Sequence, residues 1–548
     1  MDDQKALDII SRLDSLKGSR GNFESLWQEC GDYGMPSNNQ ITKKLSEGTK
    51  RGQLLFDSTA EDANVQLAAG IYSYMFPSES RAFTLKIDDE ALNENDNVKQ
   101  WLDKTTKAIH EYLTQSTFRE AFFEFLLSLG AFGTACLYEE KGKKVPINFV
   151  CHHMATIYIG VNSDGIVDTI FREFEYTARQ AYQEFGDKCS KSVMDAYSDE
   201  KTRNKKFTFI HAVYPREDYD PDKQDPVNMP YASEWVDRAD RVVIMTSGYE
   251  ELPYQVSRFY KDSFEVYGRS PMMKKMPDIK MVNRMQKTRI KAWEKMCDPP
   301  IILPDDGSIS QVATQPAGVI YKRAGSDDPK WFEFRGNIAK MEEAIQAVQT
   351  SIIKGFYLDM FDPLIDRQNM TATEVMARVE QKMRFLTPII GRLQSELFNP
   401  LIHRIIGILA RQVDKTGKTL IPSPPPELEN SSYSIVYLGR LALAIKTLES
   451  EGLQKTLAEW SPMAEAGFTS WLDNLDIDVA FRDAGRNNGI PATWLKDVKK
   501  RDEERLAKQK AQQAQMMMEQ VPNIAKAAKA GSSKPEEGSP TEMILNAA

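Results

Sequence analysis

Two helical segments that flank a short non-helical stretch constrain the fold of this chain most strongly. In residues 277–298 and 337–358, apolar side chains recur at helical spacing, as Ile338 and Ile345 illustrate. The stretch between them, residues 299–336, is rich in Pro, Gly and Asp and contains short runs typical of β-strands. The pattern predicts an antiparallel helix pair with a small β-containing domain at its tip.

The first of these helices carries a row of five cations, which we call the basic stripe. Its members follow one another at spacings of four, three, four and four residues: Lys280, Arg284, Lys287, Lys291 and Lys295. On a helix, this spacing places all five on one side, away from a second and mostly apolar side. A solvated charged face and a face that approaches phosphate groups both fit the pattern, and both interpretations remain open.

The rest of the chain alternates between helical and β-type patterns, so the predicted fold class is α+β and mainly helical. A first helix is expected to end at Gly18, and a helix over residues 96–129 follows a strand at 82–87. Residues 134–260 are mostly β-type, and Asn162-Ser163-Asp164-Gly165 has the composition of a hairpin turn.

The C-terminal part is expected to be largely helical. A long helix over residues 371–412 should be disturbed at Pro388 and Pro400, and residues 433–510 also have helical patterns.

Composition limits the possible partners. The chain has 548 residues, enough for roughly three or four domains. With 70 basic and 79 acidic residues, its net charge of −9 excludes nucleic-acid binding by whole-protein charge. No run of 18 apolar residues predicts a membrane span, and the N-terminal residues lack the pattern of a secretory signal. Five widely spaced cysteines without a CxxC motif fit a reducing compartment.

Motifs of nucleotide, dinucleotide, serine-hydrolase and zinc-protease sites are all missing from the sequence. We therefore predict no catalytic residue, cofactor or metal. Cys151-His152-His153 is interpreted as a strand edge with two surface histidines, because adjacent strand residues point to opposite faces. Two acidic groups, Asp218-Asp220-Asp222 and Asp473-Asp476-Asp478, are interpreted as solvated loops, since the first lacks the Gly and Glu that a calcium loop requires.

Several motifs, taken in order, resemble those of the portal or head-to-tail connector proteins of short-tailed bacteriophages. The resemblance extends from about residue 20 to residue 460. It rests on Asp57-Ser58-Thr59-Ala60 through Met75-Phe76-Pro77, on Asp164-Gly165 to Phe174, on Tyr267-Gly268-Arg269-Ser270-Pro271 with Met276-Pro277-Asp278-Ile279-Lys280 and Asp298-Pro299-Pro300, on Met370-Thr371-Ala372-Thr373-Glu374-Val375, on Gly391 to Leu397, and on Pro422 to Pro426 with Tyr437 to Leu443.

The resemblance implies a homo-oligomeric ring, usually of twelve subunits, at one capsid vertex of the virion, made in the host cytoplasm. Double-stranded DNA would pass through its channel during packaging and ejection, without sequence preference. The implied partners are the terminase or packaging ATPase, the major capsid and scaffold proteins, and tail adaptor proteins. Because the chain lacks a P-loop, it would be the passive ring and not the motor.

The family's regions map onto the chain in order. Residues 1–276 would form the wing, helical at first and then β-rich, 277–298 and 337–358 the stem helices, 299–336 the clip, and 359–370 a channel loop. Residues 371–429 would return to the wing as a long helix and Pro-rich connector, 430–520 would form a helical crown, and 521–548 a disordered tail. The channel loop would contain Met360, Phe361, Asp362, Pro363, Leu364, Ile365, Asp366, Arg367, Gln368 and Asn369.

Two other functions remain as alternatives. One is a metal-dependent enzyme acting on nucleic acid through an Asp cluster. The other is a helical scaffold or adaptor that does not close into a ring. Within the portal hypothesis, the basic stripe could face DNA or pair with acidic side chains of a neighbouring subunit.

Overall fold

The computed structural model describes residues 2–53, 55–76, 81–89, 92, 95–142, 145–220, 223, 225–302, 325, 330–331, 336–361, 386–413, 417–428, 433–437, 455, 458–459, 478, 480–482 and 501–512. The chain divides into two compact units. The first comprises Met1–Ala82 and Ala108–Ile421, and the second comprises Phe83–Lys107 and Pro422–Ala548.

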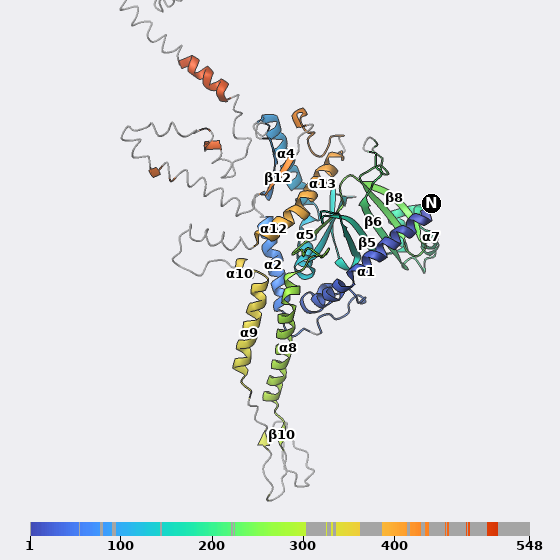
Figure 1. Ribbon diagram of the computed structural model, residues 1–548, viewed down its shortest axis with the longest axis vertical. Coiled ribbons are helices and arrows are strands. Elements are labelled where there is room, and N and C mark those ends of the chain that lie inside the picture. The colour runs from blue at the N-terminus through green and yellow to red at the C-terminus, as the bar shows by residue number, and fades with distance from the viewer. Residues whose placement is uncertain are drawn as a thin grey trace, which may run out of the picture. The chain divides into compact units, whose positions relative to one another are not determined.

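The first unit contains a five-stranded antiparallel sheet with the strand order β4-β5-β6-β7-β8 (Figure 1). Its strands are β4 (Ile157–Val161), β5 (Val167–Thr177), β6 (Lys206–Pro215), β7 (Tyr231–Asp237) and β8 (Val242–Tyr249). The predicted hairpin joins β4 to β5, and there Asn162 Oδ1 accepts hydrogen bonds from the backbone N–H groups of Asp164 and Ile166 at 3.0 and 2.9 Å. Gly165 completes the turn with a φ of +75°, a conformation that glycine adopts without strain.

Helices cover both faces of this sheet. They are α1 (Asp2–Gly34), α6 (Ala178–Phe185) and α7 (Lys191–Ser198). On one face, Ile9 and Leu13 of α1 pack with Phe171, and on the other face Phe174 packs with residues of α6 and α7. Phe171 and Phe174 serve opposite faces because they lie three residues apart on one strand. The sequence patterns did not predict β7, α6 or α7.

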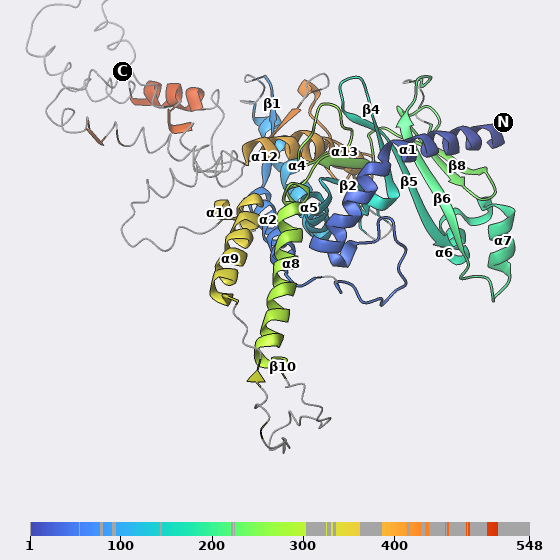
Figure 2. The same cartoon turned by 60° about the horizontal axis from the view of Figure 1, so that its bottom comes forward.

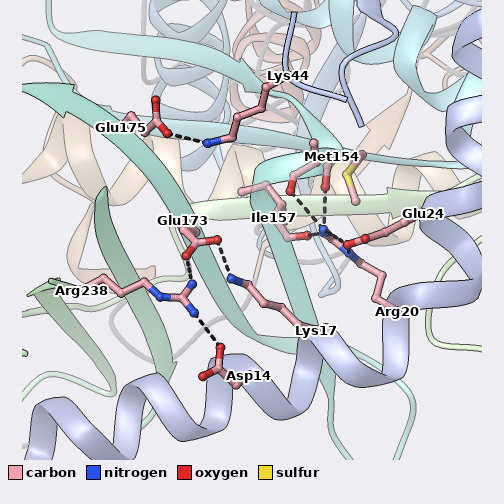
Figure 3. A network of polar contacts seen from close by, with 11 residues as sticks. Asp14, Lys17, Arg20, Glu24, Lys44, Met154, Ile157, Glu173, Glu175 and Arg238 are labelled. Carbon is pink, nitrogen blue, oxygen red and sulfur yellow. Dashed lines mark hydrogen bonds and ion pairs between the residues drawn. The ribbon is translucent and has the colours of Figure 1, made fainter. Parts of the chain in front are cut away.

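The helix α1 continues through Gly18, so the prediction that it ends there is wrong. Contacts on both sides of that glycine hold the helix against the sheet, Lys17 before it and, after it, Arg20, which donates to the carbonyl of Ile157 in β4 (Figure 3). Lys17 Nζ lies 2.6 Å from Glu173 Oε2, and Arg238 bridges Glu173 to Asp14. These tertiary contacts outweigh the modest cost of a glycine inside a helix.

A second, three-stranded antiparallel sheet has the order β3-β2-β9, with β3 at Ile147–His152, β2 at Thr134–Lys141 and β9 at Tyr254–Arg258. Two helices, α2 (Thr59–Met75) and α5 (Phe118–Phe132), pack together beside it. Phe76, Phe118, Phe122 and Phe398 form an aromatic cluster with ring centroids 5.0 to 5.6 Å apart. This cluster anchors both helices to the C-terminal part of the unit.

Two long helices project from the body side by side (Figures 1 and 2). They are α8 (Pro271–Cys297) and α9 (Ile338–Gly355), and we call them the helix pair. At their far end, β10 (Ile301–Ile302) pairs antiparallel with β11 (Lys330–Trp331). The predicted antiparallel pair with β structure at its tip is thus present, although α8 begins at Pro271 rather than at residue 277. The other residues of the 299–336 segment lie mostly outside the described part of the chain.

The long helix expected over residues 371–412 is interrupted near Pro388 and Pro400, as predicted. After residues 371–385, which lie outside the described residues, α12 (Thr387–Leu393) leads into a π-helical turn, η5 (Gln394–Phe398), and then α13 (Asn399–Ala410). Pro388 and Pro400 both lie at the first positions of their helices, where no backbone N–H is needed.

The second unit contains a two-stranded antiparallel sheet formed by β1 (Phe83–Ile87) and β12 (Tyr433–Tyr437). The strand β1 was predicted, whereas β12 lies in a segment expected to be helical. Trp101 of α4 (Asp96–Gln115), a helix that crosses the boundary between the units, donates its indole N–H to the carbonyl of Pro422 at 2.8 Å. Residues 501–512 are helical, while most of the predicted crown and the whole 521–548 tail lie outside the described residues.

The predicted fold class, α+β and mainly helical, is confirmed. The helix expected over residues 96–129 is two helices, because α4 ends at Gln115 and α5 begins at Phe118. Short 3₁₀ turns complete the described elements: η1 (Pro36–Asn38), η2 (Met154–Thr156), η3 (Gly186–Lys188) and η6 (Pro426–Leu428). Among the described helices, none is both long and apolar enough to cross a membrane.

Candidate functional site

The helix pair begins at a close approach between two backbone segments. The motif Tyr267-Gly268-Arg269-Ser270-Pro271 leads into α8, and a Cβ on Gly268 would lie 2.3 Å from the carbonyl oxygen of Gly133. Only glycine fits this approach, because a side-chain carbon would clash with a backbone atom that cannot move away. Ser270 then caps α8, since its Oγ accepts from the N–H of Met273 at 3.0 Å and donates to the carbonyl of Ala131 at 2.8 Å. The motif therefore fixes the start of α8 against α5.

A polar cluster joins the two helices near the body. Lys275 Nζ of α8 lies 3.0 Å from Asp278 Oδ2 and donates to Ser351 Oγ of α9 at 2.9 Å. Ser351 Oγ in turn donates to Asp278 Oδ2 at 3.0 Å. Gly355 lets the aliphatic part of Lys275 lie directly on α9, because a Cβ there would be 2.4 Å from the Lys275 Cε. The cluster fixes the register of the pair.

A single carboxylate also ties both helices to the start of α2. Asp57 Oδ2 accepts hydrogen bonds from Gln286 Nε2 of α8 at 3.1 Å and from Gln349 Nε2 of α9 at 2.7 Å. Its other oxygen accepts from the N–H of Thr59 at 3.0 Å. Burial opposes ionisation of Asp57, but the three hydrogen bonds outweigh it and hold the pKa below its ordinary value.

The helix α9 ends earlier than expected, because Tyr357 interrupts it. Tyr357 has a φ of +59°, and its hydroxyl contacts that of Tyr260. A short helix, α10 (Leu358–Phe361), follows and contains Met360 and Phe361. The break predicted at Asp362-Pro363 and the rest of the proposed channel loop, Asp362 to Asn369, lie outside the described residues.

The structure places the basic stripe along the edge of the buried side of α8, because Lys280, Arg284 and Lys287 each directly follow a buried residue. At the body end, Lys280 Nζ forms an ion pair with Glu29 Oε2 at 2.7 Å, and Lys287 Nζ lies 5.2 Å from the ring centre of Phe56. Arg284, Lys291 and Lys295 are exposed, and within the described part of the chain they have no carboxylate at ion-pair distance. The predicted stripe thus has two cations in contact with the body and three exposed to solvent.

The structure contradicts the interpretation of Cys151-His152-His153 as a strand edge with two surface histidines. His152 is buried against Tyr138 and Tyr254, so it is not a surface histidine. His153 accepts from the N–H of Ala155 at 3.0 Å through Nδ1, and its other ring nitrogen lies 3.2 Å from the carbonyl of Asn38. Burial lowers the pKa of both imidazoles, which keeps them neutral near pH 7.

The acidic groups do not converge among the residues that the structure describes. Asp220 pairs with Lys223 at 3.0 Å, and Asp478 pairs with Arg505 and Arg501 at 2.5 and 3.2 Å. Asp222, Asp473 and Asp476 lie outside the described residues. Searching the described ranges finds no group of three or more His, Cys, Asp or Glu side chains that could hold a metal ion.

Two buried arginines organise the body, and the sequence patterns did not single out either of them. Arg20, only 1% exposed, donates to the carbonyls of Met154, Ala155 and Ile157 at 2.9, 3.0 and 2.5 Å (Figure 3). Arg404 of α13 is 3% exposed. The roles of both arginines depend on contacts with residues that are distant in sequence. The spacing of neighbouring residues in the sequence does not indicate such contacts.

Arg404 meets a buried carboxyl group. Its Nε lies 3.7 Å from Glu139 Oε1, and its Nη1 donates to the carbonyl of Glu251 at 2.7 Å. Gln255 Nε2 donates to the same Glu139 oxygen at 3.0 Å. Burial nevertheless dominates and raises the pKa of Glu139 to about 8. This cluster joins α13 to the three-stranded sheet.

Comparison with known proteins assigns the whole arrangement to one family. The family model of the bacteriophage head to tail connecting protein matches residues 6–495. The chain is 29% identical over 486 residues to the probable portal protein of Bordetella phage BPP-1, covering 86% of this chain and 85% of that protein. It is 27% identical over 524 residues to the portal protein of Salmonella phage epsilon15, covering 92% and 91%. The resemblance found in the sequence motifs is thereby confirmed, and the chain belongs to the family of bacteriophage head to tail connecting proteins.

Proposed function

We propose that this chain is the subunit of a portal ring at one vertex of the phage head. Copies of the chain, twelve by family resemblance, close around an axis along which double-stranded DNA enters during packaging and leaves during ejection. One observation carries the proposal: the family match extends over nearly the whole chain and includes the projecting helix pair, an element suited to form a tube when it is repeated around an axis.

The parts of the chain take specific roles in this ring. The helix pair is the stem, and the β10–β11 ribbon is the start of the clip. Met360 and Phe361 lie where α10 leads into the channel loop, residues 359–370. The body with its two sheets is the wing, and residues 430–520 supply the crown. The ring is structural, docks the packaging ATPase and later the tail adaptors, and contacts the capsid and scaffold proteins.

A direct test is the assembly state of the full-length protein. Native mass spectrometry, with negative-stain images of the same sample, should give one mass near twelve chains and rings with an axial hole. The measurement is repeated after incubation with the phage scaffold protein, because the ring could require scaffold protein in order to assemble. A protein that stays monomeric with scaffold and cleaves DNA in the presence of Mg²⁺ would refute the proposal and favour the enzyme, and a monomer without cleavage would favour the adaptor.

A further inference from the structure

The contacts of the basic stripe indicate which way the helix pair faces. Lys280 pairs with Glu29 of α1, and Lys287 lies over Phe56, which belongs to the segment between α1 and α2. The stripe is therefore on the side of α8 that adjoins the body. In both views α1 and the five-stranded sheet lie on this side of α8, while α9 lies on the other side (Figures 1 and 2).

The helix α9 carries its own exposed row, which we call the α9 row. Its members are spaced by four, three, four and four residues and are all exposed: Ala339, Glu343, Gln346, Thr350 and Lys354. The residues that bind α9 to its neighbours occupy another part of its circumference. Ile345 and Ile352 are buried, Ser351 contacts α8, and Gln349 reaches Asp57. The α9 row therefore points away from both α8 and α2.

Closure into a ring decides which of these two surfaces is inside. The width available to each copy grows with its distance from the axis, so the widest part of a subunit must lie outside. A sheet of five strands spaced about 4.8 Å apart is wider than a single helix. Since this sheet and the basic stripe lie on the same side of α8, the opposite side, formed by α9, is nearer the axis.

We propose that α9 lines the DNA path through the α9 row, and that the basic stripe of α8 faces outward, toward protein. The inference rests on the proposed portal function and assigns the DNA-facing residues within it.

The chemistry of the α9 row suits a surface along which DNA slides. It contains one acidic and one basic side chain, so its formal charge is zero. Thr350 donates its hydroxyl to the carbonyl of Gln346 at 2.8 Å, which leaves that hydroxyl proton unavailable to phosphate. A row of five cations would instead release counterions and hold the duplex in a salt-dependent way. The neutral row permits weak contacts that do not depend on sequence.

Site-specific photocrosslinking in DNA-filled heads tests the assignment. The photoreactive residue p-benzoylphenylalanine replaces Thr350 in one variant and Lys291 of the basic stripe in another, and Gln346 serves as a second α9 position. Each variant is first shown to form rings, so that a failure of the portal function is recognised separately. Empty heads supply the control without DNA.

We expect position 350 or 346 to crosslink to DNA at least tenfold more than position 291, whose products should be protein adducts. DNA crosslinks at 291 that equal or exceed those at 350 and 346 would overturn the proposal. Absence of DNA crosslinks at both α9 positions in filled heads would overturn it as well, whatever position 291 gives.

Discussion

The side-chain amide of Gln349 donates a hydrogen bond of 2.7 Å to the Asp57 carboxylate, which joins the second projecting helix to the body. Gln286 of the first helix donates to the same oxygen at 3.1 Å. Both helices therefore depend on one carboxylate at the start of α2. This shared contact helps to hold the root of the helix pair against the body.

Replacing Asp57 with Ala should loosen this junction. The variant loses three hydrogen bonds to a charged group and leaves two amides unpartnered, so the free energy of unfolding should fall by about 2–4 kcal/mol. Urea denaturation monitored by circular dichroism measures the change. Glu294→Ala, which removes an exposed carboxylate from α8, serves as the control and should match the wild type. Equal midpoints for the Asp57 variant and this control would contradict the junction role.

The Asp57 contacts also predict a loss of stability in acid. The pKa of this carboxyl is below its ordinary value in the folded protein, so its contribution is present above the pKa of the unfolded chain and is lost as pH falls. Wild type and Asp57→Asn should therefore converge in stability below pH 4. A constant difference between them from pH 7 to pH 3 would show that ionisation of Asp57 does not matter.

Replacing Arg20 with Ala should be among the most destabilising changes in the body. Its guanidinium bonds to three carbonyl groups and to Glu24, and it lies 3.8 Å from the ring centre of Tyr158. Removal takes one charged donor from each of these three carbonyls, so we expect a loss of about 3–5 kcal/mol in the free energy of unfolding. Lys44→Ala is a matched control, because Lys44 also pairs with the sheet but its side chain is 92% exposed. A loss no larger than that of the control would contradict the assigned role.

The raised pKa of Glu139 predicts that stability falls as pH rises near neutrality, which is opposite to the effect of Asp57. Burial raises its pKa to about 8 from an ordinary 4.5, so the folded protein retains a proton that the unfolded chain releases. The free energy of unfolding should therefore fall between pH 5 and pH 8, by up to about 1.4 kcal/mol per pH unit. Glu139→Gln should remove this slope, whereas Glu200→Gln in an exposed turn should retain it. Thermal unfolding at four pH values measures the difference, and identical slopes in wild type and Glu139→Gln would contradict the account.

Charges added to the α9 row should slow DNA movement. Gln346→Lys with Thr350→Lys adds two cations per subunit, and repetition around the ring creates two belts that bind phosphate. We expect slower packaging that recovers as salt is raised, measured as packaged DNA length against time. The stripe variant Arg284→Gln/Lys291→Gln/Lys295→Gln should fold normally and package DNA of full length. Packaging that fails in the stripe variant but not in the α9 variant would reverse the assigned orientation.

The helix pair could be predicted from the sequence because its signals are local. Apolar residues at helical spacing define α8 and α9, and the turn chemistry of Asn162 to Gly165 defines the β4–β5 hairpin. The strand β12 could not be predicted, because its pairing with β1 joins segments that are more than 340 residues apart. The helix end predicted at Gly18 was wrong for a similar reason, since the ion pair of Lys17 and the hydrogen bonds of Arg20 join α1 to residues that are distant in sequence.

The candidate site was only partly accessible to sequence reasoning. The basic stripe was found from its spacing, but its direction depends on Glu29 and Phe56, which are distant in sequence. The roles of Asp57, Arg20 and Glu139 also depend on tertiary contacts. Gln286 and Gln349 carry no pattern that marks them as partners of one carboxylate, so the junction became visible only in three dimensions.

The most direct test of the central claim is a cryo-EM reconstruction of the DNA-filled phage particle without imposed symmetry. The account predicts that copies of this chain form one closed ring at a single vertex, with the helix pair around the DNA and α9 nearest the axis. A reconstruction that places the chain at all vertices, or away from the DNA path, would contradict it.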